Sequence, residues 1–472
     1  MKLKKLIAIG LATVLTFSLV GCGSKDSKKD TKETATKTES TKSSDDASAS
    51  KLDYQKVVFG ETGKDLSTTI KFFSHKTDLK ENGTYDKLIA KFNETYPNIK
   101  VEVEATTTYA DDALLRLTSD NWGDIMMIPA VDKNELSKYF MPYGTYDQLS
   151  TQYNYITNWM YKGDVYGMPS AANAQGIVYN KKVFTDAGIT SIPKTPDEFI
   201  AALQAIKDKT KAIPLYTNYA AGWTLGAWDA YIGGSATGDA DFQNRVLPYQ
   251  KDPFADRKDG TGPYALYKIL YDAVNKGLTE EDYTTTDWEG CKGMINKGEI
   301  GCMALGSWAV SQMQAAGDNG ADIGYMSFPI SVNGTQYATA GPDYCYGINA
   351  KSSDDNKLAS ELFVKFMVEQ SGLAFSEGSL PIVKSDTKLP ELFSAFQGVE
   401  FVVDTPAEEG KEDILNQVNT ESELMINAGG NTKVAEIIEH AANKDESFDD
   451  IMADWNQKWS DAQDSVGVDV TK

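Results

Sequence analysis

Short apolar segments alternate with amphipathic ones along the chain from about residue 67 onward. Residues 99–105 alternate apolar and charged side chains, as a half-buried strand does. Residues 85–96 instead repeat apolar side chains every three or four positions and stop before Pro97, as a helix does. The same patterns predict strands at 67–73, 124–128, 213–217, 300–305, 323–328 and 344–349, and helices at 111–117, 196–207, 262–276, 288–296, 309–316 and 356–369, with a last helix that ends near Trp459. This alternation is typical of an α/β fold.

The first residues predict export. Residues 2–5 are mostly lysine, and an apolar run from Leu6 to Leu19 follows them. That run is too short to span a bilayer comfortably and ends in small residues, which is typical of a cleaved secretory signal over residues 1–21. Cys22, directly after Leu-Val-Gly, resembles the lipobox of bacterial lipoproteins. The resemblance implies a lipid on Cys22 that anchors the protein at the outer face of the cytoplasmic membrane. The alternative is a secreted protein whose cysteine at this position is unmodified.

Residues 23–50 are polar throughout. They consist largely of Ser, Thr, Lys, Asp, Glu and Ala, without an aromatic residue, Val, Ile or Leu. Such a segment buries too little apolar surface to offset its chain entropy, so we expect disorder. With the lipidated Cys22 it makes a leash (22–50) with a reach of roughly 30 Å. The remaining chain is long enough for two domains with cores of their own.

The net negative charge of the chain excludes some classes of binding partner. The chain has 46 Lys and Arg against 68 Asp and Glu, which gives a net charge of −22 at pH 7. An acidic surface argues against binding nucleic acid and against direct adhesion to anionic lipid. We therefore expect contact with the membrane through the lipid anchor alone.

Cysteine and histidine are too few for most catalytic and metal-binding motifs. Beyond Cys22 the chain has Cys291, Cys302 and Cys345, at spacings unlike those of a metal site, and it has only 2 histidines. The sequence contains no H-E-x-x-H zinc motif and no G-x-S-x-G element. We expect no cofactor, no metal ion and no enzymatic activity. The three cysteines are predicted to be buried, and a bridge between two of them stays open.

An ordered series of short motifs resembles the extracellular solute-binding proteins of ABC importers, in the carbohydrate-binding branch typified by maltose-binding protein. Each motif is short, but together they run through most of the chain from about 66 to 460. They are residues 92–101 (FNETYPNIKV), 117–125 (LTSDNWGDI), 163–169 (GDVYGMP), 178–181 (VYNK), 187–189 (AGI), 193–199 (PKTPDEF) and 303–308 (MALGSW).

The resemblance implies a periplasmic-binding-protein-like clamp of type II, in which two α/β lobes joined by multiple hinge crossings close on a solute. It places lobe 1 at 66–172 and 331–383, and lobe 2 at 173–330 and 384–472. It also implies a monomer that takes up a small-molecule carbohydrate and delivers it to the membrane permease subunits of an ABC importer.

Candidate ligand-binding residues follow from the predicted strands, because open α/β sheets bind ligands outside the carboxyl ends of their strands. This rule selects side chains that come after predicted strands: His75, Asp132, Trp223 and Trp308. It also selects Asn173, in the segment 170–175 that precedes the next apolar run. Asp343 and Tyr344 enter by the resemblance alone, because residues 341–344 are predicted to open a strand rather than to close one.

A sugar has ring faces rich in C–H groups and edges rich in hydroxyls. A selective pocket therefore needs aromatic surface for the faces and planar amides or carboxylates for the edges. We predict two aromatic platforms, Trp223 and Trp308, and two polar clamps, Asn173 and Asp343, with His75, Asp132 and Tyr344 behind them. The positions that match Asn173 and Trp308 line the cleft in similar proteins, although relatives often carry a carboxylate where Asn173 stands. The tryptophans predicted to be structural are Trp122, Trp159, Trp288, Trp455 and Trp459.

The leading functional prediction is a lipid-anchored receptor for a sugar, in particular an oligosaccharide. Aromatic and amide side chains favour a neutral polyol over an anion. The same fold with a polyamine or an amino acid as its solute is one alternative. A surface glycoside hydrolase is a more distant one, because it needs two carboxylates that face one bond. Import and a sensory role remain equally open.

Overall fold

The computed structural model describes residues 54–119, 121–427 and 432–471. The expected signal at 1–21, the lipidation of Cys22 and the leash lie outside these residues. Within the described part of the chain, no helix combines the length and the apolar character that a membrane span requires.

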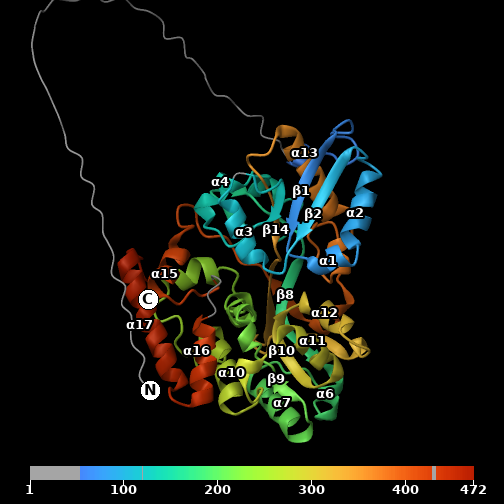
Figure 1. The fold of residues 1–472 in the computed structure, drawn as a ribbon. Helices are drawn as coiled ribbons and strands as arrows, with labels where there is room; N and C mark the ends of the chain where they lie inside the picture. Colours follow the sequence, from blue (N-terminus) through green and yellow to red (C-terminus); the bar gives the residue numbers. More distant parts are fainter. Residues whose placement is uncertain (1–53, 120, 428–431, 472) are drawn as a thin grey trace, which may run out of the picture. The chain divides into compact units, whose positions relative to one another are not determined.

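A five-stranded sheet, in the order β2-β1-β3-β14-β7, forms the centre of lobe 1 (Figure 1). Strand β1 pairs in parallel with β2, from Thr68 opposite Ile99 to Ser74 opposite Ala105, and β14 runs antiparallel to β3. Three β-strands of this sheet, β1, β2 and β3, therefore end at the same edge. The strands are β1 (Thr68–Ser74), β2 (Ile99–Ala105), β3 (Ile125–Met127), β7 (Met168–Pro169) and β14 (Cys345–Ile348).

Helices pack on this sheet and enclose its core. The long helix α13 contacts β1 and β14, and α2 contacts β2. A small sheet in the order β4-β6-β5 lies in the same part of the chain. The helices are α1 (Thr77–Glu81), α2 (Thr84–Asn93), α3 (Tyr109–Leu117), α4 (Leu136–Tyr139), α5 (Tyr146–Leu149), α13 (Asp354–Glu369) and α14 (Leu373–Ser376), and the small strands are β4 (Gly144–Thr145), β5 (Met160–Tyr161) and β6 (Asp164–Val165).

The second sheet, in the order β12-β13-β8-β10-β9, forms the centre of lobe 2, with β11 also paired to β8 and β15 to β13. Every residue of β10 is buried, because helices cover both faces of the sheet there. The strands are β8 (Ala172–Asn180), β9 (Ile213–Leu215), β10 (Ile300–Gly306), β11 (Ile323–Ser327), β12 (Ser331–Val332), β13 (Thr335–Pro342) and β15 (Val399–Val402). Side chains of β10 alternate between two cores, with Met303 and Leu305 in one and Cys302 and Ala304 in the other.

Four helices of lobe 2, α6, α7, α11 and α17, begin at a side-chain cap. Helix α7 starts with Pro196, and its N-cap Thr195 accepts a hydrogen bond from the Glu198 N–H at 3.3 Å. Helix α10 packs against α16, and α15 packs against α17. The helices are α6 (Lys181–Asp186), α7 (Pro196–Lys209), α8 (Gly226–Asp229), α9 (Gly234–Thr237), α10 (Gly262–Asn275), α11 (Trp288–Lys297), α12 (Ala309–Ala315), α15 (Ile414–Ser422), α16 (Thr432–Asn443) and α17 (Phe448–Val466).

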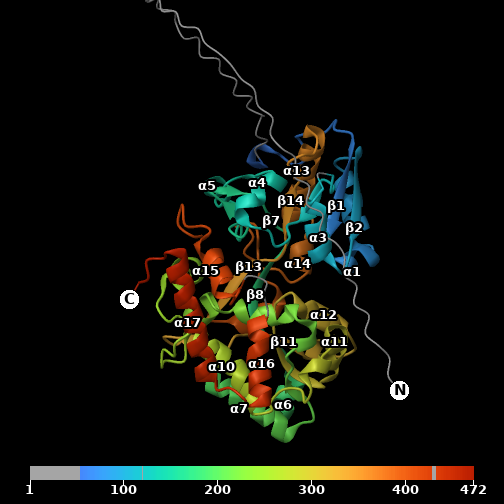
Figure 2. The same ribbon diagram turned by 60° about the vertical axis from the view of Figure 1, so that its left-hand side comes forward.

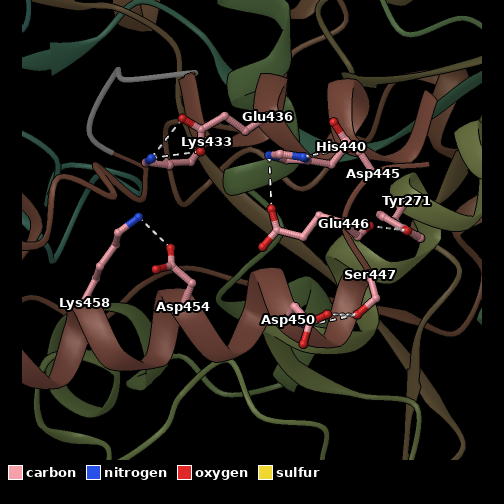
Figure 3. A network of polar contacts seen from close by, with 10 residues as sticks. All are labelled: Tyr271, Lys433, Glu436, His440, Asp445, Glu446, Ser447, Asp450, Asp454 and Lys458. Carbon is pink, nitrogen blue, oxygen red and sulfur yellow. Dashed lines mark hydrogen bonds and ion pairs between the residues drawn. The ribbon is translucent and has the colours of Figure 1, made fainter. Parts of the chain in front are cut away.

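The turn between α16 and α17 is tied by a polar network (Figure 3). His440 Nδ1 lies 2.9 Å from Asp445 Oδ1, and its Nε2 lies 3.5 Å from Glu446 Oε2. Ser447 caps α17 by accepting from the Asp450 N–H at 3.2 Å. This histidine therefore has local structural partners within its own helical hairpin.

Strands β8 and β13 connect the two lobes, and they lie side by side in the sheet (Figure 2). One prediction for this region is only half right. Residues 341–344 lead into a strand, β14, as predicted, but Gly341-Pro342 also closes β13, so Asp343 and Tyr344 follow one strand and precede the next. Asn173, in the segment 170–175, lies inside β8. The reason is that these residues pair with each other across a long sequence separation, which local patterning does not reveal. The last helix also continues beyond Trp459 to Val466.

The three described cysteines are buried, and each is a free thiol: Cys291, Cys302 and Cys345. The prediction of buried cysteines is thus confirmed, and the open alternative of a bridge between two of them is excluded. Burial raises the pKa of the Cys291 thiol to about 12 and moves the pKa of the other two in the same direction.

Candidate functional site

One face of strand β8 is left partly open by its neighbours. Asn173 lies opposite Gly341 of β13, and Gln175 lies opposite Gly306 of β10. Directly opposite residues of antiparallel strands point to the same face, so these four residues share one face of the sheet. We call this face the floor. Gln175 and Gly341 are partly exposed, whereas Ala174, which points to the other face, is buried.

Trp308 covers one end of the floor. It follows Ser307 after the end of β10 and directly precedes α12. A Cβ added at Gly306 would lie 2.6 Å from Nε1 and 2.7 Å from Cδ1 of Trp308. The indole therefore rests against the Gly306 backbone on the floor side, and a residue without a side chain is needed beneath it.

Three indoles pack together at this end, and we call them the tryptophan group. Ring centroids lie 5.0 Å apart for Trp223 and Trp288, 5.8 Å for Trp223 and Trp308, and 5.6 Å for Trp288 and Trp308. The indoles come from three places: the turn after β9, the start of α11 and the end of β10. Trp223 is 51% exposed, so the group presents an aromatic surface to solvent. Trp288, which the sequence predicts to be structural, reaches both partners because α11 packs on β10.

Asp343 extends the floor at the opposite end. Its N–H donates to the Ala171 carbonyl at 2.9 Å, which extends by one residue the pairing between β8 and β13, the two hinge strands that connect the lobes. Asp343 comes two residues after Gly341 and so points to the same face. The strand from Ala171 to Gln175 covers about 13 Å at ~3.3 Å per residue. The distance between Asp343 at one end and Trp308 at the other thus exceeds the width of one sugar ring.

Asn173 is bound to the end of β10 in the middle of the floor. Its Oδ1 accepts from Ser307 Oγ at 3.1 Å, and the same Ser307 oxygen accepts from the Ala174 N–H at 3.2 Å. The Asn173 residue is only 6% exposed. The bond from Ser307 holds the amide in one orientation, with its oxygen on Ser307 and its nitrogen as a donor for a ligand.

A second aromatic group lies in lobe 1 beside Asp343. His75 and Tyr344 have ring centroids 4.4 Å apart, and Tyr109 lies 5.9 Å from His75 and 5.5 Å from Tyr344. His75 Nε2 is 4.0 Å from Asp343 Oδ2. Tyr109 is positioned by its hydroxyl, which donates to the Met127 carbonyl at the end of β3 at 2.5 Å. We call His75, Tyr109, Asp343 and Tyr344 the His75 group; Tyr109 is the member that sequence reasoning missed, because its role depends on packing between α3 and β3.

The imidazole of His75 is neutral at pH 7. Burial lowers its pKa to about 4, although the nearby Asp343 carboxylate acts in the opposite direction. Its Nδ1 is buried without a hydrogen-bond partner. Burial also raises the pKa of Tyr344, which keeps its hydroxyl protonated. A neutral imidazole and a phenol both donate and accept hydrogen bonds, which suits hydroxyl groups better than an anion.

Asp132 does not join either group. It is exposed, and the Asn416 side-chain amide of α15 donates to its Oδ1 at 3.4 Å. The chain continues for several residues after β3 ends at Met127 before it reaches Asp132, which carries the carboxylate away from the strand end. The structure thus places six of the seven predicted side chains at the floor or at its ends. Two belong to the tryptophan group, three to the His75 group, and Asn173 lies on β8 between them, whereas Asp132 lies apart.

Two cavities among the described residues offer little to a sugar. An open groove of about 610 Å³ lies along β1 and β2, and none of the predicted site residues line it. Its aromatic rings are covered: Phe73 and Trp122 are buried, and the Arg116 guanidinium lies 3.7 Å from the Phe73 ring centroid. A cavity beside His75 holds only about 20 Å³, the space of roughly one water molecule.

The chemistry that these residues offer is stacking and hydrogen bonding. The described residues contain no group of three or more His, Cys, Asp or Glu side chains placed to hold a metal ion. The floor supplies an amide, a carboxylate and bare backbone, and the two aromatic groups lie at its ends. Such an arrangement can bind an elongated, uncharged ligand along β8.

Comparisons with known proteins all point to solute-binding proteins. The chain matches the model of the bacterial extracellular solute-binding protein family over residues 76–372. The multiple sugar-binding protein of Streptococcus mutans is 27% identical over 317 residues, which cover 64% of this chain and 72% of that protein.

Two solved structures are more similar. BlMnBP2, a manno-oligosaccharide-specific solute-binding protein of Bifidobacterium animalis subsp. lactis in complex with mannotriose, is 50% identical, with a TM-score of 0.85 over 88% of this chain and 99% of that chain. BlMnBP1, the binding protein of an ABC transporter of the same organism in complex with mannobiose, is 51% identical, with a TM-score of 0.84 and the same coverage.

The family match begins just after β1 and ends just before α14, and it includes most strands of both sheets, β8 and β13 among them. The solved relatives are two-lobed solute-binding proteins, and the predicted two-lobed α/β clamp is confirmed by their similarity. The chain belongs to the bacterial extracellular solute-binding proteins.

Proposed function

We propose that the protein binds a manno-oligosaccharide between its lobes, along the floor, and delivers it to an ABC importer. The observation that carries this proposal is the position of two aromatic groups at opposite ends of one open strand face about 13 Å long. The mannobiose and mannotriose complexes of BlMnBP1 and BlMnBP2 support the choice of sugar.

Each group has a distinct role in this proposal. Trp308 and Trp223 stack on the ring faces at one end, where flat apolar C–H surface meets an indole. The Asn173 amide and the Asp343 carboxylate bind hydroxyls along the floor, and His75 and Tyr344 bind the far end from lobe 1. Closing the lobes brings the His75 group and the tryptophan group onto one ligand, which stabilises the closed form by differential affinity.

The wider setting also belongs to the proposal. The protein acts as a monomer without chemistry of its own, and a lipid on Cys22 holds it at the outer face of the membrane, where it meets the permease subunits. The lobes keep the predicted boundaries, 66–172 with 331–383 for lobe 1 and 173–330 with 384–472 for lobe 2, except at one of the crossings. Because β13 pairs with β8 and β15, we place the return crossing to lobe 1 after Pro342 rather than near 331.

The test is a calorimetric titration of the protein with mannobiose, mannotriose and longer manno-oligosaccharides. Separate titrations with polyamines and amino acids test the alternative solutes. We expect binding of the mannose series with no hydrolysis products by chromatography. A second measurement is thermal unfolding with and without ligand. A ligand concentration about 100-fold above the Kd should add roughly 2.7 kcal/mol to the free energy of unfolding and raise the melting temperature by a few degrees.

Two substitutions of one residue sharpen this test. Trp308→Ala removes the ring face, and Trp308→Phe keeps a smaller one, so affinity should fall strongly in the first and mildly in the second. Binding of an amine or amino acid without any sugar would overturn the carbohydrate assignment. Release of shorter sugars during the titration would instead indicate a hydrolase.

A further inference from the structure

Gly341 occupies the middle of the floor and has open space above it. It lies opposite Asn173, and Asp343 follows two residues later on the same face. A Cβ added at Gly341 would meet no atom within 4 Å, and its φ lies outside the left-handed range. The residue is partly exposed. Neither backbone strain nor packing within the protein therefore requires glycine at this position.

Other glycines of the same sheet are different. A Cβ at Gly176 would lie 2.5 Å from the Met326 carbonyl oxygen, and one at Gly306 would lie 2.6 Å from the Trp308 indole. At those two positions the fold itself excludes a side chain. At Gly341 the space is left free by the protein, on the face where the polar groups of the site converge.

We propose that Gly341 is a specificity-determining residue, which sets the depth of the binding site so that a middle sugar ring lies directly against the β13 backbone. The inference rests on the proposed function and names the part of the site that decides which ligands enter. Asn173 lies across from Gly341 on β8, and Asp343 follows Gly341 two residues later, so a ring that sits over Gly341 presents its edges to both. Any side chain at Gly341 projects into the volume that this ring occupies.

A larger side chain at position 341 should therefore weaken sugar binding more than a smaller one. Alanine adds one methyl group to the floor and lifts the ring slightly, whereas leucine fills the space between Asn173 and Asp343. Overpacking of a well-fitted site typically costs enough to weaken binding by about tenfold or more. The unliganded protein has no atom to clash with, so its melting temperature should stay close to that of the wild type.

The experiment measures the affinity for mannotriose by calorimetry in Gly341→Ala and Gly341→Leu. The matched control is Gly293→Leu on α11, because a Cβ at Gly293 also meets no atom within 4 Å and its φ is likewise outside the left-handed range. Melting temperatures without ligand are recorded for all variants. We expect Gly341→Leu to lose at least about tenfold in affinity, Gly341→Ala to lose less, and Gly293→Leu to bind like the wild type.

Each outcome decides the matter. Unchanged affinity in Gly341→Leu, with wild-type binding intact, overturns this inference and leaves the proposed function standing. Failure of the wild type to bind any manno-oligosaccharide overturns the proposed function and this inference with it. If Gly341→Leu does not fold, the inference is refuted by wild-type affinity in Gly341→Ala and supported by reduced affinity in that variant with an unchanged melting temperature.

Discussion

Replacing Gly306 by alanine tests whether the bare backbone positions the Trp308 platform. The new Cβ would lie 2.6 Å from Nε1 and 2.7 Å from Cδ1 of the indole, so the ring must rotate away or the strand must shift. Overpacking of this kind costs about 1–3 kcal/mol. If the added methyl group destabilises by this amount the indole position that binds sugar, the Kd for a manno-oligosaccharide rises by about 5- to 150-fold.

A double-mutant cycle separates this effect from a general disturbance of the strand. Calorimetry would give the Kd for mannotriose in the wild type, Gly306→Ala, Trp308→Ala and the double variant. If Gly306 acts through the indole, the loss caused by Gly306→Ala should largely disappear once Trp308 is alanine. Gly293→Ala, with open space at its Cβ on α11, is the control for loss of a glycine.

Two results would refute the reasoning. An equal loss in both backgrounds would mean that the alanine acts on the β10 backbone or on Gln175 rather than on the indole. No loss in either background would mean that the position of Trp308 above Gly306 contributes nothing to binding. Melting temperatures must accompany the titrations, because a shift of the buried strand would lower stability in both backgrounds alike.

Three further predictions concern stability and spectroscopy. The buried thiols Cys291, Cys302 and Cys345 should resist a thiol-reactive dye in the native protein and react once it is unfolded, and a reductant should leave the melting temperature unchanged. His75, with a native pKa of about 4 against 6.5 for a free side chain, binds its proton more readily in the unfolded state, so stability should fall by up to about 3 kcal/mol as pH drops from 6.5 to 4. Chemical denaturation of His75→Gln across that range should show a flatter profile, and an equal slope would contradict the assignment. Trp223, 51% exposed, should lose access to acrylamide when a sugar binds, and unchanged fluorescence quenching in the presence of saturating ligand would place the sugar elsewhere.

Much of the fold could be predicted because its signals are local. The alternation at 99–105 corresponds to β2 (Ile99–Ala105), and the Thr195-Pro196 start of α7 was evident from residue types alone. The strand-end rule selected Trp223 and Trp308 for the same reason, since each lies in the segment that follows a recognisable apolar strand. Caps, turns and periodicity depend on neighbours within a few positions, which the sequence displays directly.

What the sequence did not reveal concerns residues whose surroundings come from distant parts of the chain. Trp288 begins a helix, and nothing near it in the sequence indicates that its ring lies against Trp223 and Trp308. Tyr109 joins the His75 group only because α3 packs beside the end of β3. Asp132, close to a strand end in sequence, is carried away from it by the turn that follows.

The sequence by itself determined the order of strands and helices, the family resemblance and most of the candidate side chains. The tertiary structure alone decided which of them share a face. Asn173 and Gly341 are opposite each other because β8 and β13 pair across more than a hundred residues, and Gly306 supports Trp308 because β10 lies on the other side of β8. Register in a sheet is set by the packing of whole strands, and a shift of one residue would turn every one of these side chains to the opposite face.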